Sequence, residues 1–206
     1  MDKVRLEAFS DGVIAIAATL LVLNIDVPDP AHGELAHQLA RQWPSYAAYA
    51  VSFITIGIIW INHHTMVSRL AAVDHSVLFF NLLLLLAIGL LPFTTALIAD
   101  YLRDGNGQHL AAAIYAGSFL AMSIAFYAMQ RHILRNRRHL LTEQFPEEQL
   151  RAIDRRNRFG LVPYAVAAAL APLSAYLTLA ICAGIAAFYA IPQGTPAAGG
   201  GIAPGV

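Results

Sequence analysis

Residues Val77 to Ala99 read VLFFNLLLLLAIGLLPFTTALIA and contain no charged side chain. About 20 consecutive apolar residues cross the hydrocarbon core of a bilayer as an α-helix, so this stretch predicts a membrane span. Pro92 predicts a kink within the span, because proline lacks the N–H that a helical hydrogen bond requires. Asn81 is expected to form a polar contact between helices.

The rest of the chain has the same character. Of its 206 residues, 58% are hydrophobic and 13% are charged, whereas about a quarter of the residues in a soluble domain are charged. The formal net charge is zero, and the arginines between apolar runs have no interleaved aromatic residues, which argues against nucleic-acid binding. The composition therefore predicts an all-α integral membrane protein.

Six transmembrane helices are expected. Residues 159–191 are too long for one span and short for two, and Pro172 and Ser174 near the middle favour a hairpin of two short helices over one long tilted helix. The expected spans are 4–25, 44–65, 77–99, 109–130, 159–173 and 175–191, within one unit over residues 1–192. The low-complexity tail, 193–206, is predicted to be disordered.

Basic residues in the connectors predict the orientation, because cytoplasmic loops carry more Lys and Arg. Eight of the thirteen basic residues lie between Met129 and Phe159, and Lys3, Arg5 and Arg69 fall on the same side in a six-span topology. Both termini are therefore expected in the cytoplasm, and the eight arginines are expected to enforce this topology and to contact anionic lipid. The chain shows no internal duplication, so a central pathway would need several chains.

The start of the first span, RLEAFSDG, places ionisable groups beside an apolar run. An ionised side chain at the centre of a membrane helix costs about 2.5–3.5 kcal/mol, so Asp11 needs a partner or water. The end of the second span, Trp60 to His64, carries suitable donors near the same face of the membrane. A network between the two helices is one interpretation. The other is an interfacial helix start, with Asp11 hydrated among the headgroups.

A stripe of residues follows on one face of the same helix: Gly12, Ile16, Thr19, Leu20 and Leu23. Such a stripe is compatible with a face toward lipid or the core. It is also compatible with a pore, in which rings of Ile and Leu form a dewetting constriction and Thr19 supplies an oxygen layer for a cation.

The pattern Arg5-x-x-x-Phe9-Ser10-Asp11-Gly12, followed by Thr19-Leu20-Leu21, resembles the first helix of the transmembrane protein 175 family. The WINHH sequence from Trp60 to His64 is similar to the end of the family's second helix. The resemblance implies a potassium-selective channel without a cofactor, in which four six-helix chains form a homotetramer and their first helices line the pore. It implies a multi-pass protein of the bacterial inner membrane, since animal members have two such units per chain and also pass protons.

The resemblance also assigns roles to individual residues. Ile16 is expected to form the narrowest hydrophobic ring, Thr19 to coordinate the ion, and Leu20 and Leu23 to line the pore. A structural and gating network is expected from Arg5, Phe9, Ser10, Asp11, Gly12, Trp60 and His63.

Other functions have less support in the sequence than a channel. His63-His64 with Asp74 and His75 fits no zinc pattern, because adjacent histidines point about 100° apart on a helix. Packing, or a hydrogen bond to Asp11, is the expected role of at least one of these histidines. An enzyme would need a nucleophile, a base and an electrostatic stabiliser that converge on one site, and the sequence does not indicate such a set. A secondary transporter remains an alternative, although the chain shows no inverted repeat of the kind that many transporters have. A proton-permeable channel is also an alternative.

Overall fold

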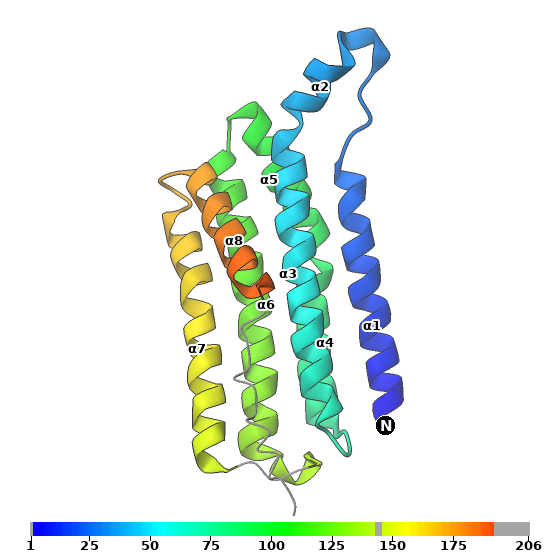
Figure 1. Ribbon diagram of the computed structural model, residues 1–206, viewed down its shortest axis with the longest axis vertical. Coiled ribbons are helices and arrows are strands. Elements are labelled where there is room, and N and C mark those ends of the chain that lie inside the picture. The colour runs from blue at the N-terminus through cyan, green and yellow to red at the C-terminus, as the bar shows by residue number, and fades with distance from the viewer. Residues whose placement is uncertain (1, 143–145, 192–206) are drawn as a thin grey trace, which may run out of the picture.

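A computed structural model describes residues 2–142 and 146–191, and the elements within these ranges are helical. Long helices lie side by side along the long axis of the molecule (Figure 1). In the described part of the chain, the extended pairing is a single isolated bridge between Leu70 and Leu141. The all-α class is thus confirmed. The tail, 193–206, lies outside the described residues.

The first span begins at a capped helix terminus. Helix α1 runs Lys3–Leu20, and Asp2 precedes it with a side chain that accepts a hydrogen bond from the backbone N–H of Val4. A 3₁₀ turn, η1 (Leu21–Asn24), continues the helix. Between this turn and the next long helix lie the 3₁₀ turn η2 (Pro30–His32) and the short helix α2 (Leu35–Arg41), where the sequence indicated only a polar connector.

The next two long segments form a hairpin, in which the first segment is one helix and the second is divided into two. Helix α3 runs Trp43–Ser68, α4 runs His75–Gly89 and α5 runs Leu91–Asp104. Helices α4 and α5 are separated at Leu90, two residues before Pro92, where a kink was predicted. The carbonyl oxygen of Pro92 accepts a hydrogen bond of 3.0 Å from the side-chain amide of Asn24, at the far end of α1.

Glycines shape the turn into the following helix. Gly105 and Gly107 have φ values of 80° and 77°, which residues with a Cβ rarely adopt. Helix α6 (Gln108–Asn136) follows this turn and extends past residue 130, the expected end of the span. The predicted Asp-Gly-Asn-Gly loop is therefore present, but α6 carries part of the arginine-rich connector as helix.

The last part of the described chain contains two helices. Helix α7 runs Glu147–Leu170 and α8 runs Ala175–Ala190, and Ser174 caps α8 by accepting a hydrogen bond from the N–H of Leu177. Helix α7 begins well before residue 159, because the charged residues up to Arg158 form its first turns. A short 3₁₀ turn, η3 (Arg138–Leu140), lies between α6 and α7.

Within the part of the chain that the structure describes, four helical segments are long and apolar enough to cross a membrane: Lys3–Asn24, Trp43–Ser68, His75–Asp104 and Gln108–Asn136. Helix α8 is a shorter apolar helix. Most exposed side chains on these segments are large and hydrophobic, which is unfavourable in water and favourable in lipid. The chain is therefore a multi-pass membrane protein.

The centre of the bundle is held by packed aromatic rings and paired hydroxyl groups. Tyr115 and Phe119 of α6 are fully buried and meet edge to face, with ring centroids 4.7 Å apart. The Ser52 hydroxyl lies 2.8 Å from that of Thr95 and 3.0 Å from that of Tyr115. These bonds join α3, α5 and α6 and satisfy polar groups that would otherwise be costly in an apolar interior.

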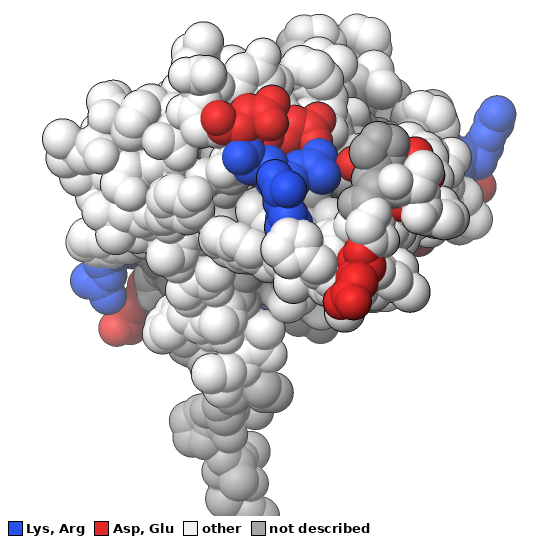
Figure 2. Space-filling model, turned by 90° about the horizontal axis from the view of Figure 1, so that it is seen from above, with Lys and Arg blue, Asp and Glu red and all other residues white. Residues whose placement is uncertain are grey.

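The two ends of the bundle are closed differently. At the amino-terminal end, the α3–α4 connector pairs with the chain after α6: the Ala71 N–H donates to Leu140 and the Thr142 N–H donates to Arg69. At the other end, Arg103 binds Asp26 and Asp100. Figure 2 views the molecule along its long axis and shows one cluster of acidic side chains against basic ones, with other charged side chains scattered over a largely uncharged surface.

Candidate pore helix and its supporting network

Helix α1 has two contrasting faces. A narrow stripe packs against the other helices, and its buried side chains are Leu6, Ser10, Ile14 and Ala17, with Leu21 just beyond. The helix lies at one side of the bundle (Figure 1), in contact with α3, α4 and α5. Much of its surface is therefore left without a partner in a single chain.

The exposed face coincides with the stripe that the sequence singled out. Ile16, Leu20 and Leu23 are 61%, 43% and 72% exposed, and Thr19 is exposed between them. Gly12 begins the stripe, and a Cβ placed on it would meet no atom within 4 Å. Since a helix turns about 100° per residue, this stripe lies almost opposite the buried one. The residues proposed for the pore are thus grouped on one free surface.

The Thr19 hydroxyl has a defined orientation on this surface. It donates a hydrogen bond of 2.9 Å to the backbone carbonyl of Ile16. A hydroxyl that uses its proton in this way keeps two oxygen lone pairs as acceptors. The exposed face of α1 consequently presents an oxygen that can accept a cation, within a stripe that is otherwise apolar.

A buried polar network anchors the first turns of α1. Ser10 is fully buried, and its oxygen accepts a hydrogen bond of 3.0 Å from the Asn81 side-chain amide of α4. The Asn81 carbonyl oxygen lies 2.8 Å from Nε2 of buried His63, on α3. Asn81 therefore joins three helices, as its position in an apolar run predicted, and it connects the predicted network residues Ser10 and His63.

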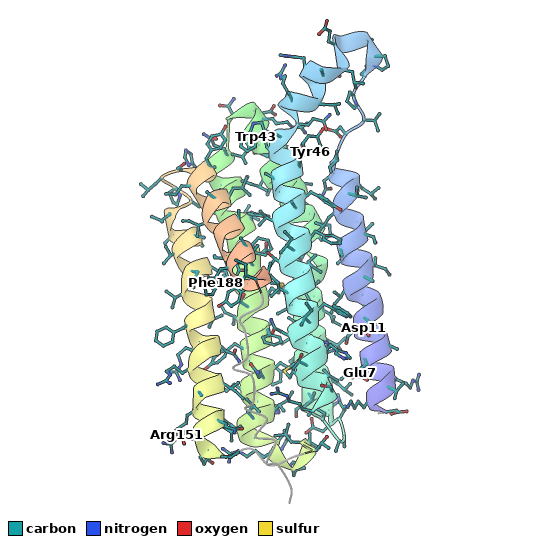
Figure 3. All side chains as sticks on the ribbon, viewed as in Figure 1. Glu7, Asp11, Trp43, Tyr46, Arg151 and Phe188 are labelled. Carbon is teal, nitrogen blue, oxygen red and sulfur yellow. The ribbon has the colours of Figure 1, made fainter. Side chains whose placement is uncertain are left out.

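Asp11 forms a separate contact one residue further along. Its carboxylate accepts a hydrogen bond of 2.8 Å from the indole N–H of Trp60, on α3. Figure 3 places Asp11 and Glu7 in the half of the molecule that holds the amino terminus. Packing or a hydrogen bond to Asp11 was expected for at least one histidine, and His63 takes the packed position, with its ring turned toward Asn81. His64 is exposed and lies beside the Trp60 ring instead.

Arg5 and Phe9 remain outside this network in one chain. Both side chains are exposed, and Arg5 has no polar partner among the described residues. Lys3 does make a contact that the sequence did not indicate, since its ammonium donates to the backbone carbonyl of Ser68 at 2.8 Å. Such a contact depends on where a connector ends in space, and no sequence pattern encodes it.

A groove of about 320 Å³ runs between α1 and α3 on the flank of the exposed stripe from Gly12 to Leu23. Ile14, Ala15 and Ala18 line its α1 side, and Phe53 and Gly57 line its α3 side. Asp11 and Trp60 close one end. The groove is apolar apart from that end, so it suits a hydrophobic side chain or a lipid chain rather than a polar ligand.

The side chains that could bind a metal are dispersed over the described part of the chain. Among residues 2–142 and 146–191, no three His, Cys, Asp or Glu side chains gather closely enough to hold a metal ion. His75 begins α4 and follows the capping Asp74, whose carboxylate accepts from the N–H of Val77 at 2.9 Å. Asp74 therefore has a structural role at a helix terminus.

Comparisons with known proteins identify the family of the chain. Residues 5–92 match the family model described as "Endosomal/lysosomal potassium channel TMEM175". A potassium channel from Streptomyces collinus is 45% identical over 190 residues, which cover 92% of each chain. A potassium channel from Chamaesiphon minutus is 42% identical and is covered over 93% of its length, with 91% of this chain aligned.

A solved structure shows the same fold. The crystal structure of a lysosomal potassium-selective channel TMEM175 homolog from Chamaesiphon minutus superimposes with a TM-score of 0.81 at 41% identity, over 91% of this chain and 96% of that one. The TMEM175 family consists of ion channels and not enzymes. The chain described here belongs to the TMEM175 family of potassium channels.

Proposed function

We propose that this protein is a potassium-selective channel in which four copies surround a central pore lined by α1. Two bacterial relatives at 42–45% identity are named potassium channels, and the structural neighbour is a potassium-selective homolog. The observation that carries the proposal is the free face of α1, where Ile16 and Leu23 are more than half exposed within an apolar helix.

Six membrane crossings with both termini in the cytoplasm fit the direction of the helices. The chain passes along the bundle through α1, α3, α4 with α5, α6, α7 and α8 in turn (Figure 1). The amino-terminal end collects Lys3, Arg5, Arg69 and the eight arginines from 131 to 158. The positive-inside rule then favours a cytoplasmic location for this end, in a bacterial inner membrane.

Four-fold assembly would cover the surfaces that one chain leaves open. Around a central axis, each α1 needs an inner face toward the pore and a flank toward a neighbouring chain. The stripe from Gly12 to Leu23 supplies the inner face, and the groove between α1 and α3 supplies a flank. We assign the groove to a second copy of this chain.

The mechanism follows from the order of side chains along α1. A ring of four Ile16 side chains excludes water when narrow, so the barrier to an ion is the loss of its hydration shell. Thr19 hydroxyl oxygens, held by their bonds to Ile16 carbonyls, replace part of that shell one turn further on. Leu20 and Leu23 extend the apolar lining toward the α2 end.

Potassium flux from reconstituted vesicles tests this proposal. Ile16→Asn should hydrate the constriction and raise flux roughly tenfold, which corresponds to about 1.4 kcal/mol off the barrier. Thr19→Ala should lower the preference for potassium over sodium. Ile124→Asn is a matched control, because Ile124 on α6 is also about half exposed. Wild-type behaviour in both α1 variants would contradict the pore assignment.

A proton-permeable channel is a second candidate with its own support. The relatives from chicken and human are named endosomal/lysosomal proton channels, and they match this chain at 38% and 40% identity over 117 residues. Those matches cover only 23% of each relative. Vesicles with an internal pH dye separate the candidates. A pH change in the absence of potassium supports a proton-permeable channel, and potassium flux without a pH change and independent of an imposed proton gradient supports a potassium channel. Coupled movement of the two ions would support a transporter.

A further inference from the structure

A polar pocket of about 340 Å³ lies between the charged end of α6 and the first turns of α7. It is separate from the α1 surface, and it gathers four of the eight arginines that were expected to contact anionic lipid. The charged side chains that line it are Arg131, Arg135, Arg138, Glu147, Arg151 and Asp154. Four arginines thus face two carboxylates, which leaves a net charge of +2 on the described lining.

Both carboxylates are already paired within the chain. Glu147 lies 2.5 Å from a guanidinium nitrogen of Arg138, and this hydrogen bond lowers the pKa of Glu147. Asp154 lies 3.3 Å from Arg135 and 2.7 Å from Arg158. Each carboxylate is therefore ionised and occupied, and neither is available to neutralise the remaining arginines.

Among the described residues, the remaining two guanidinium groups form no ion pair, although the charge of Arg151 contributes to the lowered pKa of Glu147. Arg131 donates to the Tyr127 hydroxyl at 3.1 Å, which is a neutral acceptor. Arg151 is exposed and makes no hydrogen bond or ion pair with another described residue. A guanidinium binds phosphate through two parallel hydrogen bonds, so two unpaired arginines on facing walls of one pocket favour a phosphate-bearing anion.

The position of the pocket indicates where such a phosphate comes from. Arg151 lies on α7 at the same end of the molecule as Glu7 and Asp11 of α1 (Figure 3). Helix α7 turns from charged to apolar after Arg158. Val162, three turns beyond Arg151 on the same side of the helix, is 52% exposed, and Val166 follows at 44%. An acyl chain can lie on this apolar surface while its headgroup reaches the pocket.

We propose that the α6–α7 pocket binds the phosphate of an anionic membrane lipid, with Arg131 and Arg151 as its two ligands. The lipid tails lie along the exposed apolar face of α7. This inference concerns a surface away from α1 and does not require that the protein conduct potassium.

Native mass spectrometry of the full-length protein tests the proposal. The protein is released from nanodiscs of zwitterionic phosphatidylcholine with a small share of phosphatidylglycerol, and the retained phosphatidylglycerol is counted. Arg151→Gln and Arg131→Gln should each weaken retention by about tenfold. Arg155→Gln is the matched control, because Arg155 is exposed on the same turns of α7 but does not line the pocket.

The outcomes are distinct from those of the flux experiment. Loss of retention in the two pocket variants, with Arg155→Gln like wild type, supports the proposal. Equal loss in all three variants would indicate diffuse attraction to anionic surfaces and would overturn it, as would no loss in any. A further arm adds inorganic phosphate: displacement of the lipid by millimolar phosphate would mean that free phosphate is the ligand and would also overturn the lipid assignment.

Discussion

Helix α1 and the α4–α5 segment are both apolar, yet they are buried to different extents. In the most apolar part of each, 28% of α1 is buried against 44% of the α4–α5 segment. The α4–α5 segment contacts α6 and α3 through side chains such as Thr95, which bonds within the core. Helix α1 instead uses one narrow stripe and polar contacts of Lys3, Ser10 and Asp11 near its start. Hydrophobicity alone therefore does not distinguish a scaffold helix from one that keeps a surface free.

The largest loss of stability is expected from a substitution in the buried centre of the scaffold. Tyr115→Ala removes a buried ring and leaves Ser52 without one of its partners, so we expect a loss of about 3–5 kcal/mol in the free energy of unfolding. The midpoint of thermal aggregation, followed by size-exclusion chromatography in detergent, should fall sharply. Phe188→Ala, at an exposed aromatic residue of α8, should change it little. Similar losses in both variants would contradict the prediction that the buried centre contributes more to stability than the exposed surface of α8.

A second variant tests whether the buried network holds α1 to the scaffold. Asn81→Leu leaves Ser10 and His63 buried without their partner, which we expect to cost about 1–3 kcal/mol. Hydrogen exchange should rise in α1 peptides more than in α6 peptides. Asn62→Leu, the same change at an exposed position on α3, is the control. Unaltered exchange in α1 would show that Asn81 does not anchor it.

The bond between Trp60 and Asp11 can be removed alone. Trp60→Phe keeps a ring beside the groove but loses the N–H donor, and because Trp60 is 43% exposed we expect about 0.5–1 kcal/mol. The hydrogen-exchange change should be confined to α1 around Asp11 and smaller than that of Asn81→Leu. A larger change than in Asn81→Leu would reverse the ranking of the two contacts.

The smallest effect is expected at the rim of the scaffold, where Asp74 caps α4. The hydrogen bond from the Val77 N–H is the main cause that lowers the pKa of Asp74 from its usual 3.8, and Arg137, at 2.5 Å, lowers it further. A carboxylate whose pKa is lowered by folding stabilises the folded state above pH 3.8. This contribution is lost as the pH falls through the lower pKa of the folded state. Asp74→Ala should cost about 0.5 kcal/mol at pH 7, the low end of the range for an N-cap residue, because the carboxylate is partly exposed.

The same loss should disappear in strongly acidic solution. The difference in unfolding midpoint between wild type and Asp74→Ala should shrink as the pH drops below 3.8. Asp74→Asn, which retains a capping oxygen, should fall between the two at neutral pH. A pH-independent difference would show that the carboxylate charge contributes nothing.

The sequence predicted the membrane class, the interruption near Pro92 and the polar role of Asn81, because these depend on local hydrophobicity and hydrogen-bonding chemistry. It also grouped Gly12 to Leu23 on one face through helical periodicity. Helix α2 was missed because its seven residues lack a cap and a buried face. The early start of α7 was missed because its charged turns are stabilised by partners on α6, such as the bond from Tyr127 to Asp154.

The partners of individual polar groups were harder to predict than the groups themselves. Ser10, Asp11, Trp60 and His63 were all identified, but which donor meets which acceptor depends on the rotation of α1 against α3 and α4. That rotation is set by packing of Leu6, Ile14 and Ala17 in three dimensions. A one-dimensional pattern specifies a face of a helix, but not the angle at which the face meets its neighbours.

The amide of Asn24 that binds the Pro92 carbonyl has a mechanical consequence. With Ser10 and Asp11 attached at one terminus and Asn24 at the other, α1 is fastened at both ends, while the turns between them make only apolar contacts. Neither extremity can swing outward without first breaking a polar bond. If four copies surround a pore as proposed, a movement of α1 within its own chain that widens the pore would come from twisting or bowing of the middle turns around Ile16 and Thr19.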